Sequence, residues 1–231
     1  MADVGTEEVK NLKVSTIQKL LSLREVILLY LVILLLWGLY RLLFRLPVWF
    51  EEVVLKAAVF GIPVYLTSRR HQWNWKDLGI TGTNLSASVY MGIFLGVLLG
   101  VVGNIGNIIR HGGLALAPFG LSSETMGGFL ILSLITAFWE QLLFCGMFGR
   151  LLGEMFRDEW SQAWIVTLLF VGLHLPSLVF IQHLPAVQLA VAVILLILLQ
   201  LGNMILFFRY KNLAAPVMAQ ALWGVTVFLF R

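Results

Sequence analysis

One acidic residue, Glu140, lies deep inside a long apolar segment of the chain. The segment runs over residues 126–148, and most of its other side chains are hydrophobic. An acidic side chain at the centre of a membrane-spanning helix is costly, about +2.5 to +3.5 kcal/mol for Asp on insertion scales. Such a residue is expected to face the interior of a helix bundle and to mark a candidate site.

Two further polar residues, His174 and Gln220, are expected at a similar depth. Counted along their own apolar segments at 1.5 Å per residue, the three side chains lie roughly 10 to 18 Å from one membrane surface. A buried Glu and a neutral His could together hold and activate a water for attack on a carbonyl. The carboxamide of Gln220 could donate a hydrogen bond to the resulting oxyanion. These residues therefore form a candidate hydrolytic site.

A structural role for the same residues stays open. Glu140 and His174 could pair with each other or with the backbone and hold helices together, because structural networks also bury ionisable groups. Two such residues are too few for the usual metal site, so we expect no metal and no other cofactor. The single cysteine, Cys145, lies among apolar residues and is expected to be an inert buried thiol.

The composition places this site in a membrane protein. Of 231 residues, 60% are hydrophobic and only 12% are charged, about half the charge of a soluble domain. The net charge of +4 fits membrane topology better than nucleic-acid binding, so no nucleic-acid partner is expected. We predict an all-α polytopic membrane helix bundle of about seven transmembrane helices. Their predicted positions are residues 26–46, 49–67, 85–105, 126–148, 162–181, 186–208 and 213–230.

The second segment is the weakest of the seven. Glu51, Glu52 and Lys56 crowd its start, and Glu52 and Lys56 are spaced to pair on one helix face. We therefore expect a short or tilted span. In the third segment, glycines at steps of four residues, up to Gly100, predict close helix packing.

Residues 1–25 are expected to form a cytoplasmic segment ahead of a single transmembrane domain of residues 26–231. Ser15 and Gln18 are spaced as a capping box, and the apolar residues that follow predict an amphipathic helix at the membrane interface. The positive-inside rule favours a cytoplasmic N-terminus. We expect a multi-pass protein of a bacterial or organellar inner membrane or a plasma membrane, with membrane lipids as partners. The Lys and Arg residues on the cytoplasmic side would be Lys10, Lys13, Lys19, Arg24, Arg69, Arg70, Lys76, Arg150, Arg157, Arg209 and Lys211.

Around these residues the chain resembles the CPBP (Abi) family of intramembrane glutamic proteases, which includes the type II CAAX prenyl endopeptidases. The family's first motif, Glu-Glu-x-x-x-Arg, corresponds to residues 140–145, and its second, Phe-x-x-x-His, is intact from Phe170 to His174. The third lies in a tail similar to residues 212–224. The resemblance covers about residues 68–230 and implies a CPBP/Abi-like core.

The working positions of the first two motifs are only partly kept. In the family, the first Glu and the second-motif His activate the water, and these positions are Glu140 and His174 here. The paired second Glu is replaced by Gln141, and the Arg is replaced by Cys145. The resemblance therefore implies a degenerate first motif.

The third motif has lost both of its functional side chains. The His and Asn that are thought to stabilise the oxyanion correspond to Gln220 and Gly224. Gln220 could replace one donor, but Gly224 has no side chain to offer. Losing one oxyanion donor typically lowers the rate by about 10²- to 10³-fold, so these departures weigh against efficient proteolysis.

Three functions stay open at this point. The favoured one is a pseudoenzyme with a degraded protease site, which serves as a non-proteolytic adaptor or accessory subunit of a larger membrane protein complex. The alternative is a divergent endopeptidase that cleaves membrane-anchored peptides, including prenylated CAAX-type peptides, with Glu140 as base and His174 assisting. A small transporter or lipid-handling protein is less favoured, because there are few intramembrane charges and no visible repeat.

Overall fold

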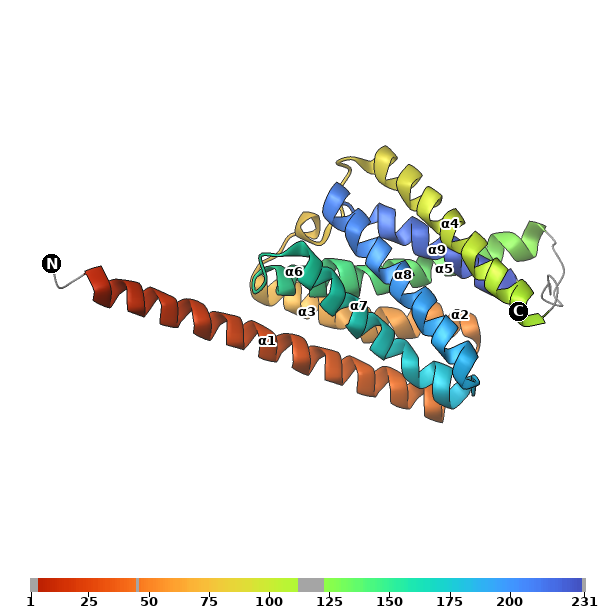
Figure 1. The fold of residues 1–231 in the computed structure, drawn as a ribbon, viewed down its shortest axis with the longest axis horizontal. Coiled ribbons are helices and arrows are strands. Elements are labelled where there is room, and N and C mark those ends of the chain that lie inside the picture. The colour runs from red at the N-terminus through yellow and green to blue at the C-terminus, as the bar shows by residue number, and fades with distance from the viewer. Residues whose placement is uncertain (1–3, 45, 112–122, 230–231) are drawn as a thin grey trace.

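The computed structural model describes residues 4–44, 46–111 and 123–229, with side chains for 19–44, 46–105 and 126–226 (Figure 1). Every regular element within these residues is a helix. This finding confirms the predicted all-α polytopic bundle. Five helical segments of the described chain are long and apolar enough to cross a membrane: Lys19–Leu43, Leu85–Ile105, Met126–Gly153, Glu159–Ile181 and Ala186–Tyr210.

The first helix, α1, runs without a break from Val4 to Leu43. Its 40 residues correspond to about 60 Å at 1.5 Å per residue, and its N-terminal part extends well beyond the other helices (Figure 1). The expected boundary at residue 25 falls inside this helix, so no bend separates the N-terminal segment from the first span. The helix is already continuous at Ser15 and Gln18, so the capping box expected there does not begin a helix. An interfacial position of this segment stays a prediction.

The second helical stretch contains two π-helical turns. It consists of α2 (Val48–Phe50), π-helical turns η1 (Glu51–Leu55) and η2 (Ala57–Gly61), and α3 (Ile62–His71). π-Helical turns are rare and frequently lie at functional sites. The charged residues of η1 are buried here, because they face the rest of the bundle and not lipid.

Two helices far apart in sequence, α4 (Leu85–His111) and α9 (Ala214–Leu229), lie side by side. Glycines of α4 make this contact possible. A Cβ atom at Gly96 would lie 2.7 Å from the carbonyl oxygen of Ala219, which is too close for any other residue. The glycines therefore serve helix packing within the chain, as predicted.

The remaining helices complete the bundle around this pair. Helix α5 (Ser123–Gln141) continues through the π-helical segment η4 (Leu142–Phe148) into α6 (Gly149–Gly153). All seven residues of η4 are buried, so the first motif lies in the core. The other elements are the short 3₁₀ turn η3 (Trp75–Leu78), α7 (Glu159–Pro176), η5 (Ser177–Ile181) and α8 (Ala186–Tyr210).

The start of α7 is fixed by a side-chain cap. The Asp158 carboxylate accepts hydrogen bonds from the backbone N–H and the hydroxyl of Ser161, both at 2.8 Å. These donors hold the pKa of Asp158 below its usual value. The cap sets where α7 begins, and thereby fixes the height at which its histidine enters the bundle.

Candidate functional site

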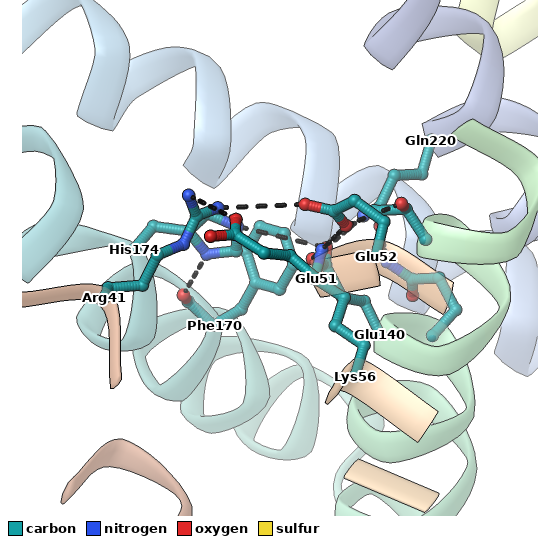
Figure 2. Close-up of polar contacts among 10 residues, drawn as sticks. Arg41, Glu51, Glu52, Lys56, Glu140, Phe170, His174 and Gln220 are labelled. Atoms are coloured by element: carbon teal, nitrogen blue, oxygen red, sulfur yellow. Dashed lines mark hydrogen bonds and ion pairs between the residues drawn. The ribbon is translucent and has the colours of Figure 1, made fainter. Parts of the chain in front are cut away.

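The structure brings together three residues that the sequence selected, each from a different helix (Figure 2). Glu140 lies near the end of α5, His174 near the end of α7, and Gln220 on α9. The side-chain N–H of Gln220 donates a hydrogen bond to Oε2 of Glu140, and Nε2 of His174 lies 3.9 Å from the same oxygen. The similar depths counted along the segments are thus matched by proximity in space.

A residue that the sequence analysis did not assign to the site, Lys56, makes the closest ionic contact with Glu140. Its Nζ atom lies 2.5 Å from Oε1 of Glu140 and 2.5 Å from Oε2 of Glu52. The lysine side chain is only 4% exposed. The predicted pairing of Glu52 with Lys56 is confirmed, and the same lysine links η1 to α5.

The ionic contacts continue from Glu52 toward α1 (Figure 2). Glu52 accepts a hydrogen bond from the Thr136 hydroxyl at 2.7 Å and lies 3.8 Å from Arg41. Arg41 also lies 3.2 Å from Glu51, which accepts a hydrogen bond from the Tyr40 hydroxyl at 2.9 Å. Three carboxylates and two basic side chains, from α1, from η1 with the adjoining Lys56, and from α5, therefore form one largely buried polar network. We refer to Arg41, Glu51, Glu52, Lys56 and Glu140 as the ionic network.

The second motif orients His174 through both its backbone and its side chain. Nδ1 of His174 lies 2.9 Å from the carbonyl oxygen of Phe170, and because a carbonyl only accepts, Nδ1 carries the proton. The two rings also pack with centroids 4.4 Å apart. Nε2 is therefore left facing Glu140. With its side chain 28% exposed, His174 lies at the edge of the buried network.

The replaced positions of the first motif form a second, uncharged network. The Gln141 side-chain N–H donates to the oxygens of Gln200, at 2.9 Å, and of Gln220. The Cys145 thiol donates to the Gln141 oxygen at 2.8 Å. The Gln220 carboxamide is thus engaged at both ends, with its N–H on Glu140 and its oxygen on Gln141. Cys145 is a free, buried cysteine, as expected for an inert thiol.

The space beside Gly224 is occupied by another side chain. A Cβ atom at this position would overlap Oγ of Ser133 on α5, whose hydroxyl donates to the Ala221 carbonyl at 2.7 Å. A larger residue at position 224 would require Ser133 to move. The site thus lacks both the side chain that the family motif has at this position and the room for it.

The ligands needed to hold a metal ion are not gathered in the described part of the chain. No group of three or more His, Cys, Asp or Glu side chains is suitably arranged there. What the arrangement offers is a carboxylate held by an ammonium and an amide, with an imidazole nitrogen nearby.

One family model matches the C-terminal part of the chain. Residues 122–226 match the family model described as type II CAAX prenyl endopeptidase Rce1-like. The matched region contains Glu140, His174 and Gln220 and begins after Lys56 in the chain. No curated protein and no solved structure matches.

Proposed function

We propose that this chain, in which residues 122–226 match the type II CAAX prenyl endopeptidase Rce1-like model, is a non-proteolytic relative of these proteins that serves as an accessory subunit or adaptor of a larger membrane protein complex. The observation that carries the proposal is the contact between Lys56 and Glu140. In a glutamic protease the carboxylate must hold a water and take its proton. Here an ammonium nitrogen lies 2.5 Å from one carboxylate oxygen, and the Gln220 amide donates to the other.

The state of the oxyanion donors supports the same proposal. The N–H group of Gln220 that would face a substrate oxyanion is directed at Glu140. Gly224 adds no donor, and Ser133 fills the adjoining space. Since each missing donor typically lowers the rate by about 10²- to 10³-fold, two missing donors leave little catalytic power.

The outer surface of the bundle suits a subunit of a membrane complex. Only 17% of the spanning window of α1 is buried inside the chain, which leaves most of this helix to contact lipid or a partner helix. We propose an orientation with the N-terminus in the cytoplasm, based on the distribution of Lys and Arg. The N-terminal part of α1 would then project into the cytoplasm, within reach of partner subunits.

Co-isolation tests the proposal. The tagged chain would be extracted from its own membrane in a mild detergent, separated on a native gel and analysed by mass spectrometry. We expect a stoichiometric partner and a mass well above that of the single chain. Migration as a single chain in detergent, with no partner at comparable abundance, would contradict the subunit role.

A second candidate function, a divergent endopeptidase, is favoured by one observation. Nε2 of His174 lies 3.9 Å from Glu140 on the partly exposed side of the site, where a water could approach both groups. Glu140 would act as base, His174 would position the water, and lipidated membrane-anchored peptides would be the substrates. Cleavage of prenylated CAAX-type peptides by the purified wild type, but not by Glu140→Ala, would select this function over the first.

A further inference from the structure

A groove of about 900 Å³ lies apart from the ionic network, between α1, the end of α3 and the residues that follow α6. Figure 1 shows α1 running alongside α3 and α6 in this region. The volume lies within the usual range for small-molecule sites, about 300–1,000 Å³. Nothing in the proposed function uses this groove.

The α1 side of the groove has a charged end and an apolar end. Arg24, Leu28 and Val32 all line it, and at steps of four residues they follow one another along one helix face. The stripe from Arg24 to Val32 is about 12 Å long at 1.5 Å per residue. Leu28 and Val32 are 51% and 53% exposed, so the apolar end is open to a ligand.

The charged end gathers basic side chains from two helices. Lys19 and Arg24 come from α1, and Arg70 and His71 come from the last turn of α3. Two carboxylates, Glu25 and Glu154, also line the groove, against three Lys and Arg side chains. Glu25 lies 3.4 Å from Arg70 and 3.2 Å from His71 and so is already paired. Among the described residues, no carboxylate lies within 4.0 Å of Lys19 or Arg24.

The position along α1 places these cations at the membrane surface. The apolar run that is expected to cross the membrane begins near residue 26, so Arg24 lies about 3 Å before it along the helix. This depth corresponds to the headgroup layer, and Leu28 and Val32 continue from it into the hydrocarbon. The order of charged and apolar side chains therefore matches the order of phosphate and acyl chain in a phospholipid.

We propose that this groove binds one anionic phospholipid. Its phosphate would lie against Lys19 and Arg24, and an acyl chain would follow Leu28 and Val32. Basic pockets of this kind at a membrane surface bind anionic headgroups, and each Lys or Arg contributes about 1 kcal/mol to the binding free energy. Removing both unpaired cations should therefore weaken binding about 30-fold.

Binding would be measured on purified, delipidated protein by native mass spectrometry and by the shift in unfolding temperature. The ligands are phosphatidylglycerol and phosphatidylcholine with the same acyl chains, and inorganic phosphate. We expect phosphatidylglycerol to bind and stabilise the wild type, and the other two to have much smaller effects. Equal effects of phosphatidylcholine would overturn the anionic preference, and equal effects of phosphate would overturn the assignment to a lipid.

A pair of matched variants tests the location. The variant Lys19→Gln/Arg24→Gln should bind phosphatidylglycerol about 30-fold more weakly than the wild type. The control variant Lys76→Gln/Arg209→Gln removes the same amount of charge outside the groove and should bind like the wild type. Native mass spectrometry counts lipid on the folded molecules only, so a loss of stability does not hide the result. Unchanged binding by the first variant, or equal losses in both, would overturn the proposal.

Discussion

Removing Lys56 should destabilise the chain more than removing the charge of Glu140. The Lys56 nitrogen lies 2.5 Å from an oxygen of each of two buried carboxylates, Glu52 and Glu140, so those oxygens are at most about 5 Å apart. Without the lysine they repel each other by about 3 kcal/mol at an effective dielectric constant of 20. Breaking a buried ion pair on one side typically costs about 3–5 kcal/mol, and we expect Lys56→Met to fall in this range.

Glu140→Gln should cost less, because Lys56 keeps its contact with Glu52. The loss of one hydrogen bond to a charged group corresponds to about 1.5–3 kcal/mol. Of the two carboxylates that contact Lys56, the double variant Lys56→Met/Glu140→Gln leaves only Glu52, which keeps the Thr136 hydroxyl as donor and Arg41 nearby. It should therefore be more stable than Lys56→Met alone, by about 2 kcal/mol.

The free energy of unfolding would be measured in mixed micelles with increasing SDS, followed by the fluorescence of the eight tryptophans. Lys76→Met, which removes an exposed lysine, is the control and should stay within about 0.5 kcal/mol of the wild type. Two results would refute the conclusion that the ionic network holds Glu140. One is a loss of stability in the double variant equal to the sum of the two single losses, and the other is a Lys56→Met variant as stable as the control.

Three further predictions concern the surrounding packing and capping. Gly224→Asn should destabilise the chain by about 1–3 kcal/mol, since it forces Ser133 aside, and Ser133→Gly should restore part of the loss in the same unfolding assay. Cys145 should resist maleimide in the folded state and react after SDS denaturation; rapid labelling of the folded chain would contradict its burial. Hydrogen bonds from Ser161 lower the pKa of Asp158. The stabilising effect of this ionised cap should therefore be complete above the ordinary carboxyl pKa, and it should disappear as the pH falls through the lowered pKa of Asp158. When the free energy of unfolding is measured at a series of pH values, the Asp158→Asn variant should not show this loss of stability.

Much of the bundle could be predicted from local patterns. Apolar length alone locates a span, which is why the segments expected at 126–148 and 186–208 agree with the helices within a few residues. The depth of Glu140, His174 and Gln220 could be counted along each helix, because the rise per residue of an α-helix is constant. The contact between these residues then followed from their shared layer.

The ionic network could not be predicted in the same way. Lys56 and Glu140 are 84 residues apart, and their contact depends on which faces the two helices turn toward each other. Two π-helical turns next to Lys56 change that face, and no simple periodicity predicts them. One signal was present: three charges within a single apolar segment, which in a membrane are expected to find partners.

Under the proposed function, Glu140 would anchor Lys56 and would not act as a catalytic base. Cleavage in the native membrane distinguishes the two roles without knowledge of the substrate. Protein termini in the membrane fraction would be quantified by mass spectrometry in cells with the wild type, with Lys56→Met/Glu140→Gln, or without the chain. We predict that the double variant, which keeps the fold but has no carboxylate at position 140, gives the same termini as the wild type. Termini that are present with the wild type and lost both in the double variant and in the absence of the chain would contradict a non-proteolytic role.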